Sequence, residues 1–380
     1  MAASAKRPRA ASGHRPESAR SRLGEFELLA RVRATVEKLG RGRGVRVGIG
    51  DDCAVVDGPR AGASFVLTTD TMVEGVHFRA GWLTPRELGV RAFRAAVSDI
   101  AAMGARPRHV LLSLEIPDTF AARDALALVR AVATDARGSG AALVGGNVSG
   151  GARVGVTVTV IGESAGTPLL RSAARVGDLV FVTGSLGGAA AGWRALSSGA
   201  VPDRTLATAY RRPPLRVDFA AALAARGLAH AVIDISDGLL QDLSHVARES
   251  RVAVRIDEAR VPVHRAARRA ATAGKGSPSP LELALTGGED YELAFTAPAA
   301  RRAAIERLAA THRTPVTVVG QIEKGEKREK REQGRAAVTD SAGRPFAVSA
   351  EGFDHLRERG AKATVHGQRA KPRAPKPRTR

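Results

Sequence analysis

The sequence predicts an α+β protein with two domains, and three observations lead to this prediction. The chain has 380 residues, whereas a single hydrophobic core stops growing at roughly 250–300 residues. Strand-like apolar runs and helical patterns are mixed along the chain without a strict βαβ alternation. The segment 164–177 is a natural boundary between two such sets. We therefore expect an N-terminal domain over 23–163 and a C-terminal domain over 164–355, with tails at 1–22 and 356–380.

The clearest element of the first domain is a helix from Thr84 to Ala105. Thr84 is an N-cap, Pro85 occupies the first helical position, and Glu87 completes a capping box. Its expected buried stripe is Leu88, Ala92, Phe93, Ala96, Val97 and Ile100. The other elements predicted for this domain are helices over 23–40 and 120–137, and strands over 45–49, 53–56, 64–69, 109–115 and 141–144, with a last strand ending near Glu163.

The second domain begins with a strand over 178–183, followed by a glycine-rich turn, GSLGG, and a helix over 188–198. A hairpin-like stretch is expected over 281–296. The remaining predicted elements are strands over 231–235, 252–256 and 315–320, and helices over 237–249 and 299–311.

The composition indicates a globular, cytoplasmic protein. The hydrophobic content is 44%, no run of about 18 apolar residues is present, and the start lacks the apolar region of a secretory signal. The single cysteine, Cys53, excludes an intramolecular disulfide and a cysteine-based zinc site. We therefore expect no membrane partner.

The net charge of +21 raises the question of nucleic-acid binding. Residues 1–22 carry six Lys or Arg and one Glu, and residues 359–380 carry eight Lys or Arg and no acid, so 5 + 8 = 13 of these charges lie in the tails. Their Ala, Pro and Ser content predicts disorder, and aromatic residues, at 4%, are scarce for base stacking. Solubilising tails are favoured over polyanion-binding tails or a transit peptide. The mixed-charge stretch 323–335 is interpreted as a solvated loop insertion.

Two adjacent aspartates interrupt a strand-like region in GIGDDCAVV, residues 48–56. A turn formed by Gly50 and Asp51 explains this pair when it is taken alone. Similar acidic features recur in both halves of the chain, and each also has an ordinary interpretation as a turn former, a cap or a first-turn residue. Their recurrence at strand ends, where sites are commonly assembled, predicts one acidic site. The features are Asp52, Asp70, Asp99, Asp234 with Ser236 and Asp237, and Glu289 with Asp290.

Several carboxylates in one cleft require cations, because two unit charges about 4 Å apart repel by roughly 4 kcal/mol at an effective dielectric constant of 20. Oxygen ligands select Mg²⁺, Ca²⁺ or Mn²⁺, and Mg²⁺ commonly joins carboxylates to substrate phosphates. The glycine pairs in GGNVSGG and TGGED fit close approach of backbone amides to phosphate. The pattern therefore indicates phosphoryl transfer. Neither a GxxxxGK[ST] loop nor the protein-kinase motif set is present, so neither common kinase class is indicated.

Six motifs in this order and spacing resemble the thiamine-monophosphate kinase family, whose superfamily includes aminoimidazole-ribonucleotide synthetase. They are GIGDDCAVV, TTDTMVEGVHF, SDIAAMGA, GGN-S, DISDGL-QDLSH and TGGEDYELAF. The resemblance covers roughly residues 23–355. It implies direct in-line transfer of the ATP γ-phosphate to thiamine monophosphate with several Mg²⁺ ions. It also implies a homodimer formed through the N-terminal sheet, with ATP bound in the cleft.

The resemblance also implies roles for individual residues. Metal ligands would be Asp52, Thr68, Thr69, Asp70, Asp99, Asn147, Asp234 and Asp237, and the catalytic centre would comprise Asp70, Asp99 and Asp234. ATP would contact Gly146, Asn147, Arg171 and Ser236. Thiamine monophosphate would contact His77, Glu289 and Phe353, where a carboxylate and an aromatic face suit a cationic thiazolium.

One position departs from the family pattern. Asn147 stands where the family often has aspartate, which keeps an oxygen ligand but removes a charge. The alternatives are another ATP-using member of the superfamily, of aminoimidazole-ribonucleotide synthetase or selenophosphate synthetase type, and a basic non-catalytic nucleic-acid binder. The N-terminal tail lacks the cysteine that selenophosphate synthetase commonly needs.

Overall fold

The computed structural model describes residues 25–40, 42–58, 60, 62–270, 278–325, 335–346 and 348. Predictions for both tails, for most of the 323–335 insertion and for Phe353 fall outside these residues. The described residues from 36 to 348 cluster into one compact unit, whereas residues 25–35 of helix α1 (Glu25–Lys38) belong to a second unit. None of the helices in the described part of the chain combines the length and hydropathy that a membrane span requires.

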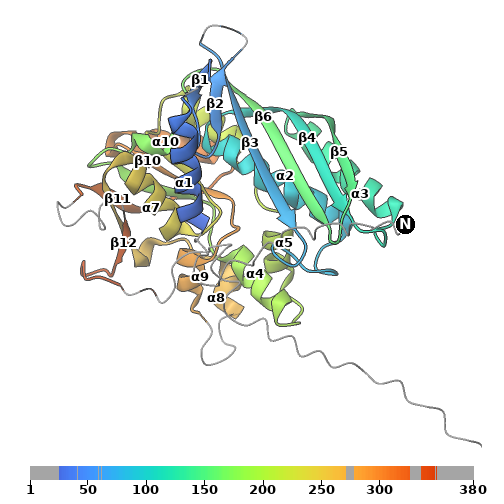
Figure 1. Cartoon of the computed structure of the whole chain (residues 1–380). Helices are drawn as coiled ribbons and strands as arrows, with labels where there is room; N and C mark the ends of the chain where they lie inside the picture. Colours follow the sequence, from blue (N-terminus) through green and yellow to red (C-terminus); the bar gives the residue numbers. More distant parts are fainter. Residues whose placement is uncertain are drawn as a thin grey trace, which may run out of the picture. The chain divides into compact units, whose positions relative to one another are not determined.

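The first sheet has six strands in the order β1-β2-β3-β6-β4-β5 (Figure 1). Neighbours are antiparallel except β4 and β5, which are parallel. Helices α2 (Pro85–Ala102) and α3 (Ala122–Gly138) pack on one face of this sheet, and threonines of β3 and β6 line the other. The strands are β1 (Val45–Val47), β2 (Ala54–Asp57), β3 (Ser64–Val73), β4 (Arg106–Ile116), β5 (Ala142–Gly150) and β6 (Gly155–Ser164).

The predicted capping box begins helix α2: the Thr84 hydroxyl accepts from the amide of Glu87, whose side chain accepts from the amide of Thr84. The expected apolar stripe is buried, but so is most of the rest of the helix, including Arg91 and Arg94. An amphipathic helix would expose those arginines. They are buried because α2 contacts the first sheet, strand β8 (Val232–Ile235) of the second sheet, and helices α3, α5 (Arg204–Arg211) and α6 (Val217–Ala225).

The second sheet also has six strands, in the order β12-β9-β11-β7-β10-β8, antiparallel except for the β12–β9 pair. One face joins the core that holds α2, and the other packs on helix α7 (Leu239–Ser250). The strands are β7 (Leu179–Thr183), β8 (Val232–Ile235), β9 (Ala253–Asp257), β10 (Glu292–Ala297), β11 (Val316–Glu323) and β12 (Ala336–Thr339).

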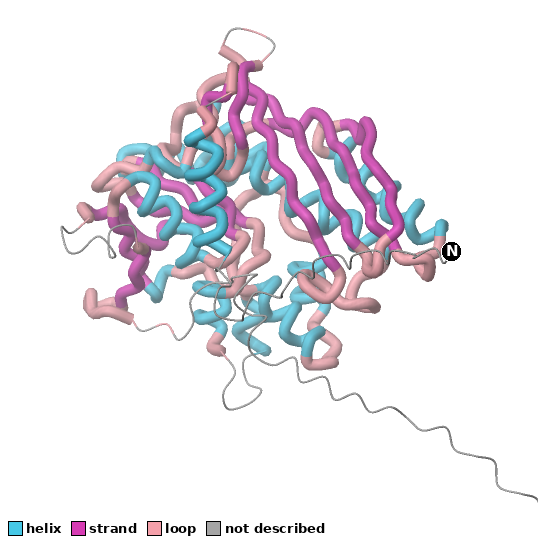
Figure 2. Tube along the Cα trace, in the orientation of Figure 1, coloured by secondary structure: helices cyan, strands magenta, loops and turns pink. Residues whose placement is uncertain are grey.

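The α+β class is confirmed, since two mixed sheets are flanked by helices (Figure 2). The predicted hairpin over 281–296 is wrong in its first half. Ser279 and Glu282 form a second capping box around Pro280, so Pro280–Thr286 is helix α9, and only β10 is a strand. The prediction also missed helices α5 (Arg204–Arg211), α6 (Val217–Ala225) and α8 (Arg265–Ala270), as well as strand β12. The other helices are α4 (Gly188–Ser197) and α10 (Arg302–Thr311).

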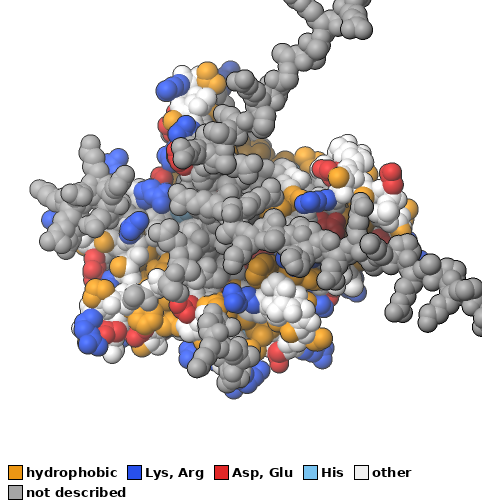
Figure 3. All heavy atoms as spheres, turned by 60° about the horizontal axis from the view of Figure 1, so that its bottom comes forward, with side chains coloured by type: hydrophobic (Ala, Val, Ile, Leu, Met, Phe, Trp, Pro, Cys, Tyr) orange, Lys and Arg blue, Asp and Glu red, His pale blue; other side chains and the backbone are white. Residues whose placement is uncertain are grey.

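The visible part of one face shows how basic side chains are distributed there. On the face shown in Figure 3, Lys and Arg lie among acidic and apolar side chains rather than in one continuous patch. Several arginines are also paired with acids across neighbouring strands, as Arg108 is with Glu163 and Arg255 with Glu323.

Candidate active site

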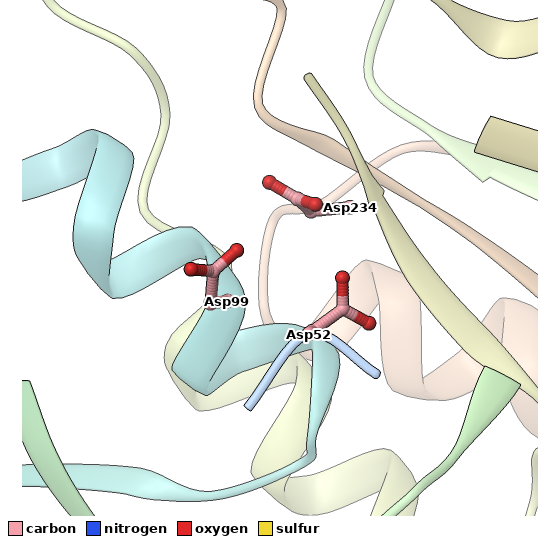
Figure 4. A group of neighbouring side chains, drawn as sticks. All are labelled: Asp52, Asp99 and Asp234. Atoms are coloured by element: carbon pink, nitrogen blue, oxygen red, sulfur yellow. The ribbon is translucent and has the colours of Figure 1, made fainter. Parts of the chain in front are cut away.

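Three aspartates from distant parts of the chain meet at the junction of the two sheets. Asp52 follows the turn before β2, Asp99 lies in α2, and Asp234 lies in β8. Each offers a carboxylate oxygen, and these oxygens lie within 4.8 Å of one another. The three side chains point toward one another in Figure 4. We call Asp52, Asp99 and Asp234 the acidic cluster.

Burial and the charges of neighbouring aspartates disfavour the charged forms of Asp99 and Asp234. Burial, followed by the charge of Asp52, raises the pKa of Asp234 to about 8. Burial also raises the pKa of Asp99 well above its ordinary value, and the charges of Asp234 and Asp52 add to this shift. One oxygen of Asp52 and one of Asp234 are buried without a hydrogen-bond partner. Since buried polar atoms are normally paired, these oxygens fit ligands of a bound cation.

Arg171 supplies part of the compensating charge. Its guanidinium donates to Asp52 Oδ1 at 2.5 Å, and its backbone amide donates to Asp51 Oδ2 at 3.2 Å. Asp51 also accepts from the amide of Asp52 at 2.9 Å. Asp51 therefore does more than form the predicted turn, because it joins the segment before β2 to the start of the C-terminal half. Burial, with the Asp52 charge second, raises the pKa of Asp51 to about 7.

Strand β3 presents alternate side chains to opposite faces of its sheet. Thr68 faces α2 and donates to Asp99 Oδ2 at 2.5 Å, and Asp70 has the same orientation two residues on. Thr69 faces the other side, where its hydroxyl lies 3.0 Å from that of Thr159. A metal-binding role for Thr69 within this cluster would have to use its main-chain oxygen.

Gly146 and Asn147 lie away from the acidic cluster of the same chain. The sheet register aligns Thr71, Thr157, Ser113 and Asn147 in one row across β3, β6, β4 and β5. Three inter-strand spacings of about 4.8 Å separate the ends of this row, so Thr71 and Asn147 are about 14 Å apart. The row includes the hydroxyl pair Thr71–Thr157, so Asn147 belongs to the face opposite the acidic cluster. We call this threonine-lined side the open face.

The turn after β8 is shaped by Asp242, which the sequence interpretation missed. One oxygen of Asp242 accepts from the amides of Ser236, Asp237 and Gly238 at 3.1, 3.2 and 3.1 Å. This carboxylate is buried in the first turn of α7 and fixes the backbone between Asp234 and the helix. The sequence shows an acidic residue in the first turn of a helix, which commonly interacts with the helix dipole. This pattern alone does not reveal that Asp242 binds the three backbone amides of the preceding turn.

Two of the residues predicted to contact the substrate, His77 and Glu289, are each held by contacts of their own. The amide of Glu289 donates to the carbonyl of Ser236 at 2.7 Å, and its carboxylate is paired with Arg91. The carbonyl of His77 accepts from the Tyr210 hydroxyl at 2.9 Å. Asp290 instead caps α4, since it accepts from the amides of Gly187 at 2.7 Å and Ala189 at 3.3 Å. Phe353 lies outside the described residues.

Comparisons with known proteins agree with this arrangement. Residues 50–164 match the family domain described as "AIR synthase related protein, N-terminal domain", and residues 175–331 match the corresponding C-terminal domain. The chain is 34% identical to thiamine-monophosphate kinase of Bacillus subtilis over 321 residues, which span 82% of this chain and 94% of the relative.

Two solved structures extend the similarity to three dimensions. One is AaThiL complexed with AMPPCP and TMP, with 30% identity, a TM-score of 0.74, and coverage of 89% of this chain and 100% of that one. The other is the thiamine-monophosphate kinase from Stenotrophomonas maltophilia, with 35% identity, a TM-score of 0.66, and coverage of 85% and 98%.

We predict that the metal-free protein loses stability as the pH rises from about 4 to about 8. Asp51 and Asp234 have folded-state pKa values of about 7 and about 8, above the ordinary value of 3.8. The folded state therefore binds more protons than the unfolded state in this window, and its stability falls with rising pH. A divalent cation offsets the repulsion between the carboxylates. The rise in unfolding temperature caused by Mg²⁺ should therefore be larger at pH 8 than at pH 6, with a difference of about 5 °C or more.

Thermal unfolding with and without Mg²⁺ at both pH values measures this effect. Asp52→Asn removes one charge of the cluster, so the difference between the two Mg²⁺ shifts should shrink. Equal Mg²⁺ shifts at pH 6 and pH 8 in the unmodified protein would contradict the prediction.

Proposed function

The chain belongs to the thiamine-monophosphate kinase family, and we propose that it transfers the γ-phosphate of ATP directly to the phosphate of thiamine monophosphate. The products are ADP and thiamine diphosphate. The observation that carries this proposal is the acidic cluster, in which two buried carboxylate oxygens lack partners and Arg171 supplies only part of the compensating charge. A set of cation ligands beside an arginine that can bind phosphate suits phosphoryl transfer.

The donor set fits Mg²⁺, which prefers oxygen ligands. Asp52, Asp99 and Asp234 would hold an ion directly, and the remaining proposed ligands are Thr68, Thr69, Asp70, Asn147 and Asp237. When bound, Mg²⁺ neutralises charge on the transferred phosphoryl group. Arg171, Ser236 and the Gly146–Asn147 segment would orient the ATP phosphates. His77, Glu289 and Phe353 would hold thiamine monophosphate so that its phosphate oxygen lies in line with the bond that breaks.

Incubation of the purified protein with ATP, Mg²⁺ and thiamine monophosphate is expected to produce thiamine diphosphate. Asp99→Asn and Asp234→Asn should each lower kcat by about 100-fold or more, because each removes charge that acts on the transferred group. Asp118→Asn, at an exposed position outside the site, is the matched control and should change kcat by less than about twofold. Absence of thiamine diphosphate at every Mg²⁺ concentration would overturn the proposal.

Direct transfer predicts inversion of configuration at phosphorus. One in-line displacement forms the new P–O bond on the side opposite the departing ADP, whereas a phosphoenzyme would require two displacements and restore the original configuration. The stereochemistry of thiamine diphosphate made from ATP with an isotopically chiral γ-phosphate distinguishes the two routes. Retention would exclude direct transfer while leaving the kinase activity established.

We further propose that the active form is a homodimer in which the open face meets its counterpart. Thr69 and Asn147 both belong to this face, yet they lie more than about 14 Å apart in one chain. Ligands of one Mg²⁺ ion each lie about 2.1 Å from it, so Thr69 and Asn147 of one chain cannot share an ion. Two chains packed through this face would allow Asn147 of the partner subunit to approach Thr69. The exposed Leu111 on the same face fits burial in such an interface.

Mixing two inactive variants tests this arrangement. Asp70→Asn and Asn147→Ala should each be inactive alone, but a heterodimer would contain one site with both residues intact. Random subunit exchange should therefore restore about a quarter of full activity. No restoration would indicate a site complete within one chain, a monomer by sedimentation would exclude the dimer, and full activity of Asn147→Ala would exclude its role.

A further inference from the structure

Arg91 is a fully buried arginine for which the proposed chemistry gives no role. It lies in α2 two helical turns before Asp99, and its side chain has no solvent exposure. Its guanidinium makes a salt bridge with Glu289 and donates to the backbone carbonyl of Tyr210. It also stacks over the Tyr210 ring, with 4.1 Å between the guanidinium carbon and the ring centroid. Burial of a charge is costly unless it is paired, so this position calls for an explanation.

The loop that carries Glu289 is held in an unusual conformation. Glu289 and Tyr291 have φ angles of 70° and 50°, in the left-handed region that non-glycine residues rarely adopt. The loop is anchored on both sides of the Glu289 side chain: the Glu289 amide donates to Ser236, and the Tyr291 amide donates to Ile235. The backbone therefore directs the Glu289 carboxylate toward α2, where Arg91 receives it.

Tyr210 connects Arg91 to the other residue predicted to contact the substrate. Its ring lies beneath the Arg91 guanidinium, and its hydroxyl donates to the His77 carbonyl. His77 belongs to the turn after β3 in the N-terminal half, whereas Glu289 belongs to the C-terminal half. Arg91 and Tyr210 thus hold together two segments separated by more than 200 residues of sequence.

We propose that Arg91 is a positioning residue for thiamine monophosphate. It orients Glu289 through the salt bridge and, through Tyr210, sets the place of the His77 turn, so that both segments meet the same ligand. This inference rests on the proposed function of Glu289 and His77. It assigns Arg91 to substrate affinity rather than to the ATP phosphates, which the acidic cluster and Arg171 serve.

The test compares Arg91 with Arg94, which is a matched control on the same helix. Arg94 is also buried, forms a 2.5 Å salt bridge with Asp135, and donates to the carbonyl of Pro213 at 2.8 Å, yet it contacts neither proposed substrate residue. Arg91→Met is expected to raise the KM for thiamine monophosphate by about 10- to 100-fold, since small displacements of a binding group have effects of this size. The KM for ATP should change by less than about twofold.

Conservative and double variants separate positioning from folding. Arg91→Lys keeps the charge but loses the planar fork, so the KM for thiamine monophosphate should lie between those of the native protein and Arg91→Met. Because Arg91 acts on Glu289 as well as on the His77 turn, the double variant Arg91→Met/Glu289→Ala should lose less affinity for thiamine monophosphate than the sum of the losses of the two single variants. Calorimetric titration of thiamine monophosphate into the Mg²⁺-loaded protein measures this binding without turnover.

Equal effects of Arg91→Met and Arg94→Met on the KM for thiamine monophosphate would overturn the inference. So would an Arg91→Met variant in which the KM for ATP rises as much as the KM for thiamine monophosphate. Additive losses in the double variant would overturn the route through Glu289. If Arg91→Met does not fold, the KM values of Arg91→Lys decide the question. A failure of the proposed function would be seen separately, because the native protein would then form no thiamine diphosphate.

Discussion

The burial of helix α2 between two sheets is the constraint on which the rest of the structure depends. Fourteen of its eighteen residues are buried, so most side chains along it must find partners in the surrounding structure. Gly89 allows its close approach to α3, since a Cβ there would lie 2.5 Å from the Leu128 carbonyl oxygen. The polar residues of α2 consequently have fixed directions. Asp99 faces the acidic cluster, and Arg91 faces the Glu289 loop, about 12 Å away along the helix axis.

The same burial explains why the acidic cluster is costly and why it is compensated from outside α2. Asp99 and Asp234 have raised pKa values because they are desolvated and repel each other and Asp52. Arg171 pairs with only one of the three carboxylates, so the charge remains incompletely balanced without a cation. The repulsion that lowers the stability of the metal-free protein is relieved when Mg²⁺ and its nucleotide bind, and this relief contributes to their affinity.

Sequence reasoning reached the fold class and the acidic cluster because their signals are local. A capping box, a strand followed by aspartate, and an ordered set of motifs can each be read within a few residues. Arg91 could not be found in this way, because an arginine beside an apolar stripe is normally a solvent-facing residue. Its burial depends on Tyr210 and Glu289, which lie 119 and 198 residues away in the sequence. The hairpin predicted over 281–296 failed for a different reason, since the capping signals of Ser279 and Glu282 outweighed the apolar pattern.

Strand alternation sets a further limit on what one chain can assemble. Thr68 and Thr69 are adjacent, but one hydroxyl meets Asp99 and the other meets Thr159 on the open face. No rotation of side chains brings Asn147 across three strands to the acidic cluster. If Thr69 and Asn147 serve the metal site, the second face of the sheet must be as functional as the first. Strand β3 would then link nucleotide binding to dimer formation. Its residues on the α2 face would bind the metal ion within one chain, whereas those on the open face would need a second chain to complete their site.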